Sequence, residues 1–258
     1  PPMPSYLLAV AVGQFDVLTS KAAGVPLRIF TAPGLRAQAQ YAMGVTEKLL
    51  PYYNRYFGVD YALPKLDQLA VPGTRTGAME DWGLISYVES GLLYDPKRSG
   101  ADTQRRIFRL VAHEVAHQWF GNLVSVASWD EIWLNEAFAT WMEAKAAEQF
   151  HPEWQTVASA RGWVERTMER DATDATRAIR SGTVREDRVF DVFDCITYSK
   201  GGAVLSMLEE WVGPDNFQKG LAAYMAERRM KSATAGDLWH HVGAAVNLTG
   251  VWACSATN

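Results

Sequence analysis

Residues 113–145 read HEVAHQWFGNLVSVASWDEIWLNEAFATWMEAK, and this stretch contains the most specific pattern in the chain. It begins with His-Glu-x-x-His, in which His113 and His117 stand four positions apart. An α-helix places positions i and i+4 on one face, so both imidazoles can reach the same metal ion. Glu114 follows the first histidine, where the base of this motif stands beside the water that the metal activates. The pattern predicts a zinc site on a helix.

A zinc site with two histidines needs a third protein ligand. Glu136 is the best candidate, because eighteen residues separate it from His117. That gap lets the first helix end and a second helix, carrying Glu136, dock antiparallel against it. Glu143 and Glu148 lie further along this second helix and are interpreted as solvated. The other histidines are interpreted as surface or core residues: His151, His240 and His241.

Hydrophobic periodicity divides the chain into a first part rich in strands and a helical second part. Strands are expected over residues 6–12, 27–31, 66–71 and 84–88, with a helix over 35–57. Later helices are expected over residues 103–120, 135–150, 152–168, 200–211, 214–229 and 235–246. Asp102 is the expected N-cap of the first of these later helices. Strands followed by helices, without regular alternation, predict an α+β fold.

Composition excludes several classes of protein. The chain has 258 residues, 48% of them hydrophobic and 21% charged, as in globular proteins. Its net charge of −4, without a basic stripe, argues against nucleic acid as a partner. Two cysteines are too few for a disulfide scaffold, and the longest apolar run is too short to span a bilayer. The lack of a signal peptide or transmembrane segment favours the cytoplasm, although the compartment is otherwise unknown.

Three motifs resemble the aminopeptidase N family, within the gluzincin zinc metallopeptidases. Residues 113–145 contain that family's His-Glu-x-x-His, eighteen residues, then Glu. Upstream, residues 77–81 (Gly-Ala-Met-Glu-Asp) resemble its exopeptidase motif Gly-Ala-Met-Glu-Asn, and Trp-Gly-Leu-Ile follows. Downstream, residues 198–202 (Tyr-Ser-Lys-Gly-Gly) resemble the segment with its catalytic tyrosine. The three motifs stand in the family's order and at about its spacings.

This resemblance implies a thermolysin-like catalytic domain, in which a mixed sheet is followed by a mainly helical part. Residues 1–15 would be the last strand of a preceding β-rich domain, and residues 16–258 the catalytic domain. The chain opens Pro-Pro-Met-Pro, without an initial Met. The resemblance implies that the family's C-terminal helical domain is missing from it. We therefore expect the chain to be part of a longer enzyme whose flanking domains are missing.

The resemblance also implies roles for the residues of the metal site. His113, His117 and Glu136 would bind one zinc ion, and Glu114 would be the general base. Zinc would polarise the scissile carbonyl while Glu114 deprotonates the attacking water. The hydroxyl of Tyr198 would stabilise the oxyanion of the tetrahedral intermediate.

The upstream motif implies the site that binds the substrate. Glu80 would anchor the free α-amino group of a peptide, which fixes how many residues precede the scissile bond. Gly77 and Ala78 would let the substrate backbone approach closely, and Met79 is a candidate wall for the first side chain. Asp81 stands where the family usually has Asn. We hypothesise that its extra negative charge tightens binding of the amine and favours basic first residues.

The predicted function is that of a zinc aminopeptidase acting on peptides with a free N-terminal amine. An endopeptidase of thermolysin type is one alternative, and the loop with Glu80 argues against it. A second alternative is a catalytically incomplete or inactive fragment that binds metal or peptide. Glu114 and Tyr198 argue against this reading, because a binding module needs neither. The family often has His-Pro where Arg177-Ala178 stands, which leaves the contacts beyond the scissile bond undefined.

Overall fold

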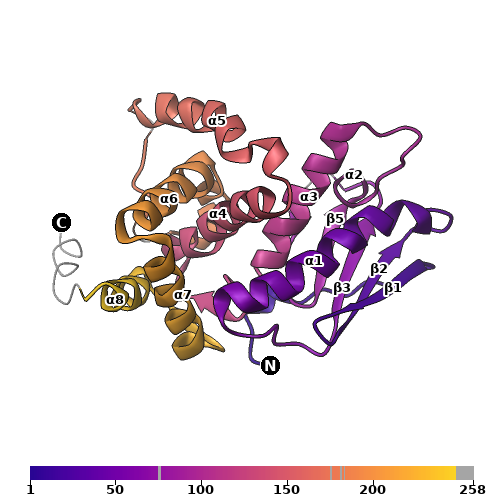
Figure 1. The fold of residues 1–258 in the computed structure, drawn as a ribbon, viewed down its shortest axis with the longest axis horizontal. Coiled ribbons are helices and arrows are strands. Elements are labelled where there is room, and N and C mark those ends of the chain that lie inside the picture. The colour runs from indigo at the N-terminus through magenta and orange to yellow at the C-terminus, as the bar shows by residue number, and fades with distance from the viewer. Residues whose placement is uncertain (75–76, 175, 181, 183, 248–258) are drawn as a thin grey trace.

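A computed structural model describes residues 1–74, 77–174, 176–180, 182 and 184–247 of the chain. Figure 1 shows the sheet and helix α1 (Gln40–Phe57) on one side and the later helices on the other, with α3 (Ala101–Ala116) and α4 (Trp133–Phe150) between them. Among the described residues, no helix is both long and apolar enough to cross a membrane. Cys254 lies outside the described residues.

The main sheet has five strands in the order β1-β2-β3-β5-β4. Its members are β1 (Asp16–Ala22), β2 (Val25–Thr31), β3 (Leu66–Val71), β4 (Ala78–Met79) and β5 (Leu84–Val88). Strands β2, β3 and β5 are mutually parallel, whereas β1 and β4 pair antiparallel at the two edges. The central strand β3 is almost wholly buried, as expected for a strand covered on both faces. The sheet is therefore mixed.

Helices dominate the rest of the chain. They are α2 (Glu89–Leu92), α5 (Thr156–Asp171), α6 (Gly201–Val212), α7 (Pro214–Arg228) and α8 (Ala235–Ala245). A short parallel pair joins β6 (Val124–Val126) to β7 (Lys231–Ala233). A mixed sheet followed by a mainly helical part confirms the predicted α+β fold class.

Helix α3 is held against α1 by buried contacts behind the metal motif. The hydroxyl of Tyr53 on α1 donates to the carbonyl of Ala112 at 2.9 Å. The indole of Trp119, just beyond α3, packs on Tyr53 and Phe57 and donates to the carbonyl of Val59 at 2.8 Å. These side chains are fully or almost fully buried, so α3 rests on a close-packed platform.

The expected strand over residues 6–12 is wrong. A single 3₁₀ turn covers Ser5–Leu7, and no described strand pairs with the residues that follow it. Leu7 is buried and its carbonyl accepts from the amide of Trp82, but Val12 is 94% exposed. An apolar run indicates a tendency to be buried, whereas a strand also needs a neighbour's backbone hydrogen bonds. The proposed domain division at residues 15 and 16 stays a prediction.

The structure also changes the start and end of the metal-motif helix. It begins at Ala101 after Gly100, and Asp102 lies in its first turn without capping it. It ends at Ala116 rather than at residue 120, because the amides of Gln118 and Trp119 bond to carbonyls three residues back instead of four. The chain then turns through Gly121, whose φ is +106°. A Cβ at Gly121 would lie 2.2 Å from the side-chain oxygen of Asn135. Only glycine fits this turn.

Candidate active site

Three buried side chains converge where α3 meets α4. His113 and His117 come from the end of α3, and Glu136 from the first turn of α4. Oε2 of Glu136 lies 3.3 Å from Nε2 of His113 and 3.4 Å from Nε2 of His117. Ligands about 2.1 Å from a tetrahedral zinc ion are separated by roughly 3.4 Å, so the spacing fits such an ion. The structure brings the three predicted metal ligands together.

The other ring nitrogens of both histidines are held by the protein. Nδ1 of His113 donates to Glu143 at 3.1 Å. Nδ1 of His117 donates to the carbonyl of Phe120 at 3.1 Å and to the side-chain oxygen of Asn135. Because each Nδ1 faces only acceptors in these contacts, Nε2 is the nitrogen of each ring that can give up its proton and offer a lone pair to a metal. Such hydrogen bonds orient histidine ligands in metal sites.

Glu143 corrects the sequence interpretation that placed it in solvent. Its side chain is buried between His113 and Arg109, and the guanidinium of Arg109 donates to its Oε1 through Nε and Nη2. Burial opposes ionisation, but the hydrogen bond from His113 and the charge of Arg109 lower the pKa of Glu143. Glu143 follows Glu136 by seven residues, two helical turns along one face of α4, and that spacing was the available signal.

The carboxylates of the site favour positive charge between the histidines. Burial alone would lower the pKa of His117, but the charges of Glu80 and Glu136 raise it to about 9. Burial would raise the pKa of Glu136, but His117 and His113 lower it to about 2. A divalent cation between these groups would take the place of the protons on the histidines. The donor set and its electrostatics therefore both fit a metal ion.

Glu114 is buried beside the cluster without a partner for one oxygen. Its Oε2 accepts no hydrogen bond from any described residue, although its side chain lines the cavity. Burial raises the pKa of Glu114 to about 8. A buried carboxylate oxygen without a protein donor calls for a water or a ligand donor in the cavity. Glu114 is thus placed to exchange a proton with a molecule bound there.

Glu80 lies at the His117 end of the same cluster. Its Oε1 accepts from the side-chain amide of Asn135 at 2.9 Å, and its backbone carbonyl accepts from Asn122 at 2.8 Å. Glu80, Glu114 and His117 each have one possible metal-ligand atom, and these three atoms lie within 4.8 Å of one another. Glu80 is therefore a second buried carboxylate beside the metal ligands, held in place from both its side chain and its backbone.

The residues of the upstream motif differ in whether they line the cavity. Gly77, Ala78 and Glu80 line the cavity, whereas Met79 and Asp81 are not among its lining residues. Ala78 and Met79 form β4, in which successive side chains point to opposite faces, and Glu80 and Asp81 follow that strand. Asp81 instead accepts from the hydroxyl of Ser86 on β5 at 3.0 Å. Contact of Met79 and Asp81 with the substrate stays a prediction.

The placement of Asp81 leads to a different prediction for Asp81→Asn. Burial is the main cause that raises the pKa of Asp81 to about 6. The native state therefore loses stability as the pH rises from about 4 to 6, because Asp81 ionises at a cost that the unfolded chain does not bear. Asn avoids this cost and can still accept from Ser86. We expect Asp81→Asn to add roughly 1–2 kcal/mol to the free energy of unfolding at pH 7.5, and much less at pH 4.5.

Thermal unfolding of the wild type and Asp81→Asn at both pH values measures this difference. The exposed Asp60→Asn is the matched control and should show no such pH-dependent gain. An equal effect of Asp81→Asn at both pH values would contradict the assignment of its cost to ionisation.

Tyr198 is positioned by an irregular helical turn. Residues Ile196–Lys200 form a π-helical turn, and the ring of Tyr198 stacks on that of His113, with centroids 6.0 Å apart. The carboxylate of Asp194 accepts from the backbone amides of Ile196 and Thr197. Tyr198 lines the cavity, on the side of His113. The turn therefore brings the predicted tyrosine to the metal ligands.

Arg177 braces this turn from the preceding loop. Its Nη2 donates to Asp194 at 2.6 Å and to the hydroxyl of Thr197 at 2.7 Å, and also to the carbonyl of Val192 at 3.0 Å. Arg177, which stands where the family often has His-Pro, thus holds the loop to the π-helical turn.

A cavity of about 750 Å³ contains these groups. Besides the residues above, its wall includes apolar side chains of α5, with Trp163 and Val157 partly in solvent. Its size is typical of sites that hold small ligands or part of a peptide.

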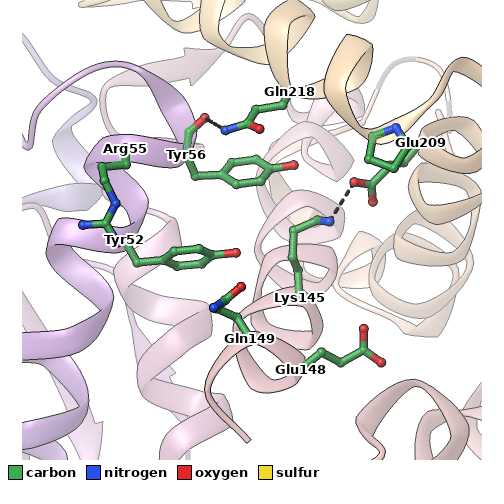
Figure 2. A pocket seen from close by; sticks show the side chains of 9 residues that line it. Tyr52, Arg55, Tyr56, Lys145, Glu148, Gln149, Glu209 and Gln218 are labelled. Carbon is green, nitrogen blue, oxygen red and sulfur yellow. Dashed lines mark hydrogen bonds and ion pairs between the residues drawn. The ribbon is translucent and has the colours of Figure 1, made fainter. Parts of the chain in front are cut away.

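A second hollow, of about 630 Å³, lies away from this cluster, between α1, α4 and the later helices (Figure 2). Lys145 forms an ion pair across it with Glu209 at 2.7 Å, and Gln218 donates to the carbonyl of Tyr56 (Figure 2). None of the predicted site residues lines it. The predicted site residues all belong to the upstream motif, the metal cluster or the turn with Tyr198, so the chemistry is assigned to the first cavity.

Comparison with known proteins supports the same interpretation. The family model described as the Peptidase family M1 domain matches residues 41–254. Glutamyl aminopeptidase of Homo sapiens is 42% identical over 240 residues, which cover 92% of this chain and 25% of that protein. Aminopeptidase M1-A of Oryza sativa subsp. japonica is 41% identical over 240 residues, covering 93% of this chain and 27% of that protein. The chain thus spans about a quarter of the length of these relatives.

Proposed function

The chain belongs to peptidase family M1, and from this premise we propose that it is the catalytic part of a zinc-dependent aminopeptidase. Its substrates would be peptides with a free N-terminal amine, from which it releases the first residue. The observation that carries the proposal is the position of Glu80, a buried carboxylate beside His113, His117 and Glu136. We further propose that residues 16–258 are the catalytic domain of a longer enzyme and that residues 1–15 belong to a preceding domain.

The metal site supports zinc as the cation. Two imidazole nitrogens and one carboxylate oxygen, with histidine Nδ1 atoms held by acceptors, match the donor set of catalytic zinc. When bound by His113, His117 and Glu136, zinc supplies Lewis acidity that polarises a carbonyl group and makes water more acidic.

The protein's own groups divide the remaining work. Glu114, with its unpartnered Oε2, accepts a proton from the attacking water and returns it to the leaving amine. The hydroxyl of Tyr198 donates a hydrogen bond to the oxyanion that develops from the scissile carbonyl. Burial and the charge of Glu136 raise the pKa of Tyr198, so its hydroxyl keeps its proton as a donor should.

Glu80 would bind the α-ammonium group of the substrate. The carboxylates of Glu80, Glu114 and Glu136 make this end of the cavity suited to a cation. An amine bound to Glu80 places the first peptide bond near the metal ligands, because one extended residue spans about 3.5 Å. This geometry selects cleavage after one residue.

The proposal is tested by cleavage of a short peptide with a free amine and of the same peptide N-acetylated. We expect zinc-dependent release of the first residue from the free peptide alone. Equal cleavage of the acetylated peptide would indicate an endopeptidase instead. Stoichiometric zinc binding without cleavage of either peptide would favour the alternative, a fragment that binds metal or peptide without turnover.

Tyr198→Phe tests the oxyanion donor separately from binding. We expect kcat to fall by about 10²–10³, because one such donor is worth that much in related sites. KM should change by less than about threefold, since the ring and its stacking on His113 remain. Tyr94→Phe, a tyrosine outside the cavity, is the control for loss of a hydroxyl. An unchanged kcat in Tyr198→Phe would remove the residue from the mechanism.

A further inference from the structure

One face of α3 carries three functional groups at four-residue intervals: Arg109, His113 and His117. At 1.5 Å per residue, Arg109 lies about 12 Å from His117 along the helix axis. Glu80 clusters with His117, whereas Arg109 contacts Glu143 at the far side of His113. The cavity therefore has a carboxylate end and a guanidinium end, with the metal ligands between them.

Arg109 is the only lysine or arginine among the described residues that line this cavity. Its guanidinium uses Nε and Nη2 to contact a single oxygen of Glu143, and its side chain is 42% exposed. No described residue accepts a hydrogen bond from its Nη1, so two N–H groups remain for a ligand. Guanidinium groups bind carboxylates more specifically than any other side chain does.

The surface beside Arg109 extends the positive charge. A shallow hollow of about 380 Å³ adjoins the cavity and shares Arg109, Leu110 and Glu143 with it. Arg105 and Arg106 also line this hollow. Asp102 lies 3.8 Å from Arg105 and is almost fully exposed, so it neutralises that charge only weakly. An anion leaving the cavity in this direction would meet three arginines.

We propose that Arg109 forms a subsite for a carboxylate on the residue directly after the scissile bond. An extended peptide anchored through its amine at Glu80 covers about 7 Å in two residues, and the carboxylate-bearing group together with the long arginine side chain covers the remaining distance. The carboxylate comes either from an acidic residue that follows the first residue or from the free C-terminus of a very short peptide. This inference rests on the proposed function, which places the amine at Glu80.

Binding of three probes to zinc-loaded Glu114→Gln protein tests the subsite without turnover. The probes are Leu-Asp-amide, Leu-Asn-amide and Leu-Asn with a free carboxylate, and isothermal titration calorimetry gives each Kd. We expect Leu-Asp-amide, and the free acid if its carboxylate reaches Arg109, to bind about 5- to 20-fold tighter than Leu-Asn-amide. Arg109→Gln should remove this preference and change the Kd of Leu-Asn-amide less than twofold. Arg109→Lys should keep part of it.

Arg161→Gln is the matched control. Arg161 is also a helical arginine with a glutamate partner, on α5 beside the cavity, but it is 82% exposed and does not line the cavity. It should leave all three Kd values unchanged. Zinc content is measured for every variant, so that loss of the metal through Glu143 is seen directly.

The inference is overturned if neither Leu-Asp-amide nor the free acid binds more tightly than Leu-Asn-amide. It is also overturned if no probe binds, or if the preference survives in Arg109→Gln. Cleavage of Leu-Asn-amide by the chain with Glu114 intact tests the proposed function separately. Cleavage without a preference for the acidic probe removes the subsite alone. A preference that depends on Arg109, without cleavage, removes the proposed function alone. If the free acid is the only probe that binds more tightly than Leu-Asn-amide, the terminal carboxylate is the ligand of Arg109.

Discussion

Replacing Glu114 with Gln is expected to lower kcat by about 10²–10⁴, the usual contribution of a general acid–base group. Gln keeps the size of the side chain but can neither take a proton from water nor return one to the leaving amine. Because Glu114 is not among the three converging metal ligands, the variant should still bind one zinc ion per chain. Release of the first residue from a free-amine peptide, with zinc content measured in parallel, checks both statements.

Glu148→Gln provides the matched control for this substitution. Glu148 lies on α4, the helix that carries Glu136, but outside the cavity, and its loss should change kcat less than twofold. A Glu114→Gln protein that keeps more than a tenth of wild-type kcat would contradict the assignment of the base. A protein that loses zinc would instead show a structural role for the carboxylate.

Removal of the metal is expected to abolish peptide cleavage and to lower Tm by roughly 5–15 °C. At a free zinc concentration of 100 to 1,000 times Kd, binding adds about 3–4 kcal/mol to the free energy of unfolding. Each kcal/mol corresponds to about 2–4 °C in Tm for a chain of this size. Zinc also offsets the repulsion among buried carboxylates around His113 and His117. Differential scanning fluorimetry with chelator and with returned zinc measures the shift.

The His117→Gln variant separates this site from incidental zinc binding. It should lose the zinc-dependent rise in Tm, because one of the three converging donors is gone. His240→Gln, an exposed histidine on α8, should retain the full rise. A rise of equal size in both variants would show that zinc stabilises the chain somewhere else.

Sequence patterns predicted the parts of the fold that depend on local periodicity. The strands Leu66–Val71 and Leu84–Val88 begin and end where their apolar runs do, and the helix expected over 135–150 begins only two residues earlier. The edge strand Asp16–Ala22 was missed, because its residues are largely polar and it forms through pairing with β2. The strand expected over residues 6–12 failed for the converse reason, since it is apolar but has no partner among the described strands.

For the site, spacing predicted which residues converge but not the surroundings that hold them. The i, i+4 histidines lie together with Glu136, which eighteen residues separate from His117, and Tyr198 lies beside them. The burial of Glu143 depends on Arg109, and that of Glu80 on Asn135, contacts between segments far apart in the sequence. Which residues of the upstream motif line the cavity depends on the position of this segment beside β5, which no local pattern gives.

The side chain of Asn135 links His117 to Glu80. Its side-chain oxygen accepts from His117 and its amide nitrogen donates to Glu80, so one planar amide joins the metal site to the proposed amine anchor. The absence of a side chain at Gly121 leaves room for that amide. Under the proposed function, the distance from the amine anchor Glu80 to the metal ligand His117 is set by one rigid amide group rather than by a flexible loop. The position of the cleaved bond then depends on the fixed distance between Glu80 and the metal ligands, and not on the first side chain of the peptide.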